Sequence, residues 1–168
     1  MVYRAAAGIA LAFFIFFLAL YRSDDPQNNT SPLLNEAAPG WTLPEVHGGE
    51  VGFDSYRGSP VLLVFWSMAS PECRRELSLV SQLAPEFRSR GIAVVGIHIG
   101  DAVNLRDYLQ GSHIAMTSLI DSNETATLAY HVHNHRLILV SADGRIQQAS
   151  DKVADEAFLR NWIDLAGK

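Results

Sequence analysis

A continuous apolar run from Val61 to Trp66 (VLLVFW) leads into a segment that marks the start of a helix. The run has the length and the β-branched, aliphatic and aromatic content of a buried strand. Ser70 then carries a hydroxyl suited to a helix N-cap, and Pro71 suits the first helical position, where a missing N–H costs nothing. Apolar residues recur further on, at Leu77, Val80, Leu83 and Phe87. The pattern predicts a buried strand that feeds directly into an amphipathic helix.

Cys73, the only cysteine of the chain, falls in the first turn of this predicted helix. The positive end of the helix dipole favours a thiolate there over a thiol. Ser70 stands three residues earlier, where a dithiol redox protein carries its partner cysteine, and Glu76 stands one turn later. We predict Cys73 as a nucleophile, Glu76 as a proton donor or acceptor, and Ser70 as a hydrogen-bond donor to the sulfur. In the alternative interpretation Cys73 is a small buried residue, Ser70 is a cap, and Glu76 pairs with Arg74 or another neighbour.

The rest of the sequence alternates between strand and helix patterns. Residues 92–99 are almost wholly apolar, as in a strand covered on both faces, and His98 within them is expected to be a core residue. Residues 137–140 and 145–148 flank a turn and predict a β-hairpin. Helical patterns are expected at residues 104–110, 123–130 and 153–165. This order of elements predicts an α/β fold.

The N-terminus differs from the rest of the chain. Residues 5–20 form an uninterrupted apolar stretch, which is short for a membrane span and also fits the core of a signal peptide. Because no clear cleavage pattern follows it, we predict an uncleaved single-pass membrane anchor over residues 1–22. Residues 23–36 are polar, contain two prolines and predict a linker. Residues 37–168 then form one domain on the extracytoplasmic side of the membrane. The formal net charge is −5 and no basic run occurs, so we do not expect nucleic acid as a partner.

The segment FWSMASPECRRE, residues 65–76, resembles the FWAxWCxPCRxE segment of the TlpA/ResA/CcmG proteins. These are membrane-anchored, extracytoplasmic thiol-disulfide oxidoreductases of the AhpC/TSA redoxin superfamily. The resemblance extends from about residue 37 to the C-terminus, through APGWTLPEVHGG, IAVVGIHIGD and LILVSADGRI. It implies a thioredoxin-like fold, with a central mixed β-sheet flanked by helices and an added N-terminal β-hairpin. It also implies protein thiols or client polypeptides of the cell envelope, such as the periplasm, as partners, for example in cytochrome c maturation.

Two departures from this family pattern affect the expected chemistry. The first motif cysteine aligns with Ser70, the second with Cys73 and the acidic residue with Glu76. The cis-proline expected before residues 137–140 is absent, and His135 or Arg136 stands at about its place. A chain with one thiol cannot cycle between an internal dithiol and a disulfide. We therefore expect either mixed disulfides formed through Cys73 alone or client binding without catalysis.

Two other chemistries are compatible with the sequence. The Ser-Pro-Glu-Cys segment also resembles the single-cysteine motif of peroxiredoxins, with Arg136 near the place of their arginine, which would make Cys73 the thiolate of a peroxidase. His131, His133 and His135 recur with period two and would face one side of an extended segment, as in a zinc or copper site of a metal-handling module. We favour a solvated histidine loop and expect neither a bound metal nor a cofactor.

Overall fold

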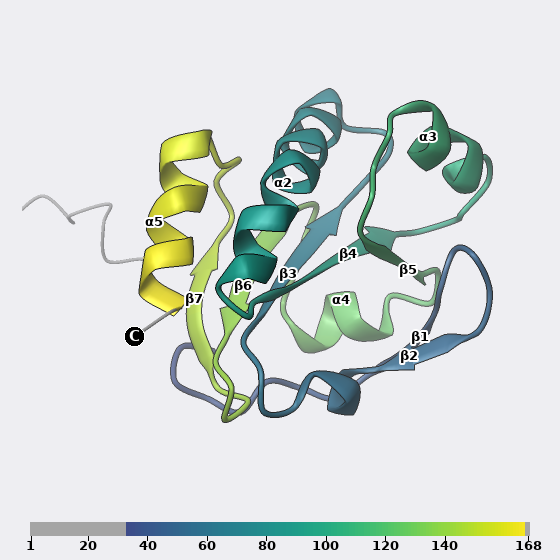
Figure 1. Ribbon diagram of the computed structural model, residues 1–168. Helices are drawn as coiled ribbons and strands as arrows, with labels where there is room; N and C mark the ends of the chain where they lie inside the picture. Colours follow the sequence, from purple (N-terminus) through teal and green to yellow (C-terminus); the bar gives the residue numbers. More distant parts are fainter. Residues whose placement is uncertain (1–32, 167–168) are drawn as a thin grey trace, which may run out of the picture. The chain divides into compact units, whose positions relative to one another are not determined.

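The apolar run found in the sequence forms the central strand of a five-stranded β-sheet (Figure 1). The computed structural model describes residues 33–166. Strand β3 (Val61–Trp66) lies between β4 (Ala93–Ile99) and β6 (Arg136–Val140), and the strand order is β5-β4-β3-β6-β7. Strands β3, β4 and β5 (Thr117–Asp121) run parallel, while β6 and β7 (Ile146–Ser150) are antiparallel to their neighbours. The sheet is therefore mixed, as predicted.

A separate antiparallel hairpin and the helices complete the fold. The hairpin consists of β1 (Thr42–Pro44) and β2 (Glu50–Gly52), and the short helix η1 (Phe53–Tyr56) follows it. The α-helices are α2 (Pro71–Ser89), α3 (Leu105–Gly111), α4 (Thr125–Ala129) and α5 (Glu156–Ala166). This is the thioredoxin-like arrangement with an added N-terminal hairpin that the sequence predicted. Edge strand β5 was not predicted, because its short TSLID sequence mixes polar and apolar residues.

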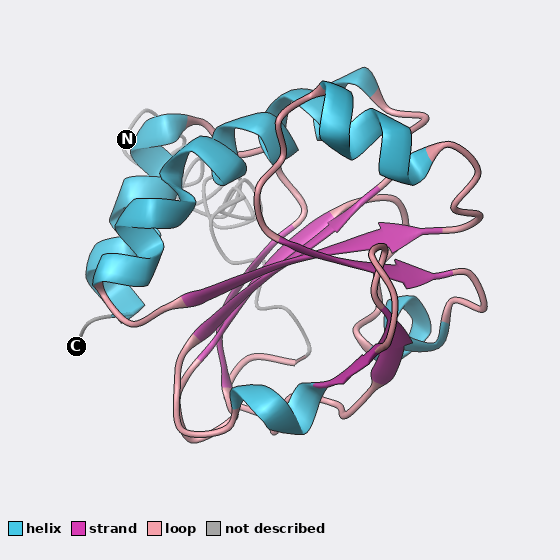
Figure 2. Ribbon diagram, turned by 45° about the vertical axis from the view of Figure 1, so that its right-hand side comes forward, coloured by secondary structure: helices cyan, strands magenta, loops and turns pink. Residues whose placement is uncertain are grey.

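Both faces of the sheet are covered, which explains the continuous apolar sequence of β3. The even-numbered side chains of β3 face a core built with α2 and α5. The odd-numbered side chains face a second core, built with α4 and the β1–β2 hairpin. Figure 2 shows these two layers on opposite sides of the sheet. All the β3 side chains are buried, so packing on both faces fixes the position at which the loop after β3 begins.

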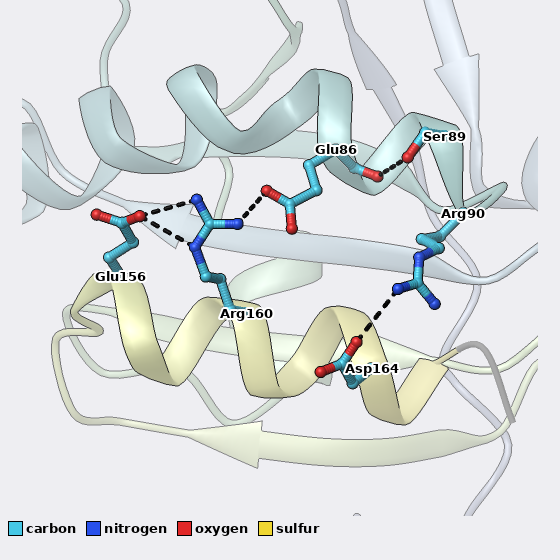
Figure 3. Close-up of polar contacts among 6 residues, drawn as sticks. All are labelled: Glu86, Ser89, Arg90, Glu156, Arg160 and Asp164. Carbon is cyan, nitrogen blue, oxygen red and sulfur yellow. Dashed lines mark hydrogen bonds and ion pairs between the residues drawn. The ribbon is translucent and has the colours of Figure 1, made fainter.

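Helix α5 lies along α2, and charged side chains join the two helices at their exposed edge (Figure 3). Arg160 pairs with Glu156 on its own helix at 2.8 Å and with Glu86 on α2. Arg90, which follows the last residue of α2, contacts Asp164 of α5 at 3.4 Å. Exposed ion pairs contribute little stability each, so the helices are held mainly by apolar packing. The buried α5 side chains are Leu159, Trp162 and Ile163. This docking brings the segment that precedes α5 next to α2.

The predicted membrane anchor, residues 1–22, and most of the predicted linker lie outside the described residues. The described end of the linker packs on the domain, since Leu33 is buried and Asn35 N–H donates to the Ile146 carbonyl at 2.9 Å. Within residues 33–166, no helix combines the length and the apolar character that crossing a membrane requires. The anchor therefore stays a prediction.

Candidate active site

The site is built at the start of α2, where the predicted helix cap is confirmed. Ser70 has an extended backbone, and its Oγ accepts a hydrogen bond from Cys73 N–H at 3.2 Å. This bond satisfies one of the N–H groups that a helix leaves free at its start. The Ser70 hydroxyl donates its own proton to Glu72 Oε2 at 3.2 Å. In this structure Ser70 is therefore a helix cap and not the predicted donor to the Cys73 sulfur.

Two side chains hold the backbone of the loop between β3 and α2. His98, on β4, accepts a hydrogen bond from Met68 N–H through Nε2 at 3.3 Å. Arg74, on α2, donates to the Met68 carbonyl. Burial lowers the pKa of His98, against a smaller opposing effect of the Gly100 backbone, so the ring stays neutral and can accept this bond. The loop that leads to Cys73 is thereby fixed to both the sheet and the helix.

Cys73 is 3% exposed and lies in the wall of an open hollow of about 440 Å³. The hollow is bordered by the start of α2, the loop before β6 and the segment after β7. Its lining includes Ser70, His135, Asp151 and the half-exposed Val153. The thiol is thus shielded from bulk solvent, but it borders a space that a segment of another polypeptide can enter.

The third predicted site residue, Glu76, is buried and joins two segments that are distant in the sequence. Its Oε2 pairs with Nε2 of His135, and its Oε1 accepts a hydrogen bond from Ala154 N–H at 2.5 Å. A carboxylate is buried at low cost only when its oxygens have partners of this kind. Glu76 therefore pairs with a histidine from the loop before β6 and not with Arg74.

His135, next to the start of β6, belongs to a connected network of charges. Burial lowers the pKa of His135, but the hydrogen bond and charge of Glu76, with a further contribution from Asp151, outweigh burial and raise the pKa. Asp151 is held in turn by Arg136, whose Nε and Nη2 donate to the two carboxylate oxygens at 2.6 and 2.7 Å. These hydrogen bonds are the main cause of a lowered pKa of Asp151. Cations and carboxylates thus neutralise one another in pairs beside the hollow.

The alternative in which the three neighbouring histidines face one side of an extended segment does not fit the structure, and the favoured solvated loop is correct for His131 and His133 but wrong for His135. His131 and His133 are exposed, whereas His135 is buried. The backbone is not extended here, because His131 adopts a left-handed φ of 53°, so the side chains do not alternate as in a strand. Among residues 33–166, no three or more His, Cys, Asp or Glu side chains are arranged to hold a metal ion. Of these three histidines, only His135 is buried, and it pairs with Glu76.

Arg136, the candidate arginine of the peroxidase interpretation, is committed to other partners. Its side chain is 8% exposed, and Nη1 donates to the Tyr130 carbonyl at 3.0 Å while the other nitrogens bind Asp151. The guanidinium therefore stabilises the loop before β6 rather than reaching toward Cys73.

Comparison with known proteins agrees with this architecture. The AhpC/TSA family model matches residues 34–149. The thiol-disulfide oxidoreductase ResA of Geobacillus kaustophilus is 23% identical over 121 residues, which cover 71% of this chain and 70% of ResA. A Mycobacterium tuberculosis protein provisionally named a peroxiredoxin is 26% identical over 102 residues, which cover 60% of this chain and 65% of that protein. The structure of a thioredoxin-family thiol:disulfide interchange protein from Chlorobium tepidum matches with a TM-score of 0.70 and 19% identity, over 79% of this chain and 96% of that one. The chain therefore shares the fold of these redox proteins.

The raised pKa of His135 should make the stability of the fold depend on pH. Such a group stabilises the folded chain fully below its ordinary pKa of 6.5, and the stabilisation is lost as the pH rises through the folded pKa. We expect the free energy of unfolding of the wild type to exceed that of His135→Gln most below pH 6.5, with a shrinking difference above it. Denaturant unfolding between about pH 5 and 9 measures this difference. The exposed His133→Gln is the matched control and should run parallel to the wild type; parallel curves for His135→Gln as well would contradict the assignment.

Proposed function

The chain belongs to the AhpC/TSA family, and from that premise we propose that it exchanges disulfides with client polypeptides through the single thiol of Cys73. The observation that carries this proposal is the position of the sulfur. Cys73 lies in the first turn of a capped helix, at its positive end, and in the wall of an open hollow. A client segment that enters the hollow brings its own sulfur next to this thiol.

A single thiol supports one half of a dithiol cycle. Cys73 attacks one sulfur of a client disulfide, so that a Cys73–client disulfide forms, the client S–S bond breaks, and the other client sulfur leaves as a thiol. A second thiol, from the client or from a further protein, then releases Cys73 by the same exchange. Ser70, which takes the place of the first motif cysteine in the family resemblance, cannot perform this release, because a hydroxyl forms no disulfide.

We further propose that the domain is held at the membrane on the extracytoplasmic side. Residues 5–20 supply an apolar stretch for the anchor, and the polar residues that follow supply a spacer. The clients are then polypeptides of the cell envelope. Disulfides persist in such a compartment, so a lone exchanging thiol finds substrates there.

Incubation of the full-length chain with a peptide that contains one disulfide tests the exchange. We expect a covalent adduct with the mass of the chain plus one half of the peptide disulfide, released again by added thiol and measured by intact-mass spectrometry. Cys73→Ala should form no adduct. Ser70→Ala should still form it, with a loss of about 1 kcal/mol in the free energy of unfolding, because it removes only the helix cap.

A folded wild-type chain that forms no adduct would contradict the exchange. Rapid oxidation of Cys73 by stoichiometric peroxide in such a chain would favour the peroxidase alternative instead. Client binding that survives Cys73→Ala, again without an adduct, would favour a non-catalytic binding module.

Fractionation of cells that produce the chain tests the anchor. The full-length chain should stay in the membrane pellet after an alkaline carbonate wash, whereas a chain that begins at residue 33 should remain in the supernatant. Release of the full-length chain by the wash would rule out an integral anchor.

A further inference from the structure

The ring of His135 has one nitrogen in use and one without a partner. Nε2 is bonded to Glu76, whereas Nδ1 is buried and has no hydrogen-bond partner among the residues that the structure describes. The Asp151 backbone lies near enough to favour a protonated ring, but not in hydrogen-bond geometry. Most buried polar atoms in proteins have a partner. Among the described residues, Nδ1 of His98 and the indole nitrogens of Trp41 and Trp66 also lack one, but of these side chains only His135 lines the hollow with Cys73.

His135 and Cys73 line the same hollow, and both are close to Glu76. Glu76 follows Cys73 by three residues on α2, and side chains at this spacing are neighbours on a helix. Cys73 and Glu76 therefore lie on the same face of α2. A thiol and an imidazole that border one hollow, with a buried carboxylate bonded to the imidazole, are the groups that act elsewhere as nucleophile, base and orienting group of the base.

We propose that His135 accepts and returns the proton of Cys73 during exchange with a client disulfide, and that Glu76 is the positioning residue for His135. This inference rests on the proposed function and assigns to it a second reacting group. Because Nε2–H donates to Glu76, the lone pair of Nδ1 is free for the thiol proton. Cys73 and His135 share no hydrogen bond in the free chain, as is common for a nucleophile and its base before a substrate closes over them.

Protons and electrons balance across one exchange. The Cys73 proton moves to Nδ1 of His135, which gives a thiolate beside an imidazolium that Glu76 stabilises. The thiolate sulfur bonds to one client sulfur, and the electron pair of the broken S–S bond leaves on the other client sulfur. His135 returns the proton to this leaving sulfur. The products are a Cys73–client disulfide, a client thiol and a neutral imidazole, and no further oxidant or reductant is needed.

Charged groups from two other segments, Glu76 and Asp151, affect the protonation of His135. Burial lowers the pKa of His135, but Glu76 from α2 and then Asp151 from the segment after β7 raise it by more. Arg136, the next residue, directs its charge to Asp151, and His133 in the same loop is exposed. The two carboxylates therefore make the ring a better proton acceptor near neutral pH.

Disulfides with different leaving groups distinguish this role from a structural one. A glutathione thiolate leaves slowly without a proton, whereas a nitrobenzoate thiolate leaves readily without one. In the full-length chain we expect His135→Gln to slow adduct formation with glutathione disulfide at least about tenfold, and with the aromatic nitrobenzoate disulfide much less. Glu76→Gln keeps the size of the side chain and should produce the same selective slowing to a smaller extent. Intact-mass time courses measure both rates.

His133→Gln is the matched control, because His133 is exposed in the same loop, and it should leave both rates unchanged. Equal slowing with the two disulfides, or no slowing, would overturn the inference and leave the proposed function intact. A wild type that reacts with neither disulfide would overturn the proposed function itself.

If the two glutamine variants fail to fold, the pH dependence of the two rates in the wild type tests the inference instead. The ratio of its glutathione rate to its nitrobenzoate rate should fall as the pH rises into the range in which the Cys73–His135 pair holds no proton, since no donor is then left for the glutathione sulfur. A ratio that stays constant over that range would overturn the inference.

Discussion

The buried carboxylate of Glu76 is the interaction on which the site depends. It accepts a hydrogen bond from Ala154 N–H at 2.5 Å and pairs with His135, so one side chain joins α2 to the segment before α5 and to the loop before β6. Because these segments are far apart in the sequence, the carboxylate sets their positions around Cys73. Removing one member of a buried ion pair leaves the charge of the other without a partner, which lowers the free energy of unfolding by about 3–5 kcal/mol. The same pair thus shapes the hollow and controls the charge beside the thiol.

The loop before β6 is held by side-chain interactions where the family resemblance expects a rigid proline. His135 is tied to Glu76, and the next residue, Arg136, is tied to Asp151 and to the Tyr130 carbonyl. Two adjacent residues are thereby anchored to different parts of the domain. The absence of the proline and of the first motif cysteine is therefore accompanied by a buried ion pair at the same site. In the proposed exchange, His135 of this pair is the proton acceptor for the single thiol.

Much of the fold follows from local sequence patterns, whereas the site depends on contacts that those patterns do not show. The apolar run of β3 and the cap at Ser70 were predicted correctly, because strand burial and helix capping are decided by residues close together in the chain. The Glu76–His135 pair joins residues 59 positions apart, and the bond from Met68 to His98 spans 30 positions. Periodicity carries no signal for either. The histidine spacing misled for a physical reason, since the left-handed turn at His131 breaks the alternation of a strand. One signal in the sequence did point to His135. It stands at about the place of the family's cis-proline, and the family pattern also has an acidic residue at the position of Glu76.

The titration of His135, followed by nitrogen NMR on the full-length chain, tests the central claim most directly. In the wild type we predict a pKa above the ordinary 6.5 and a neutral ring that keeps its proton on Nε2. In Glu76→Gln burial becomes the dominant effect, and the pKa should fall below that value. A His135 ring that titrates at 6.5 in both proteins would contradict the pairing and with it the proposed link to Cys73.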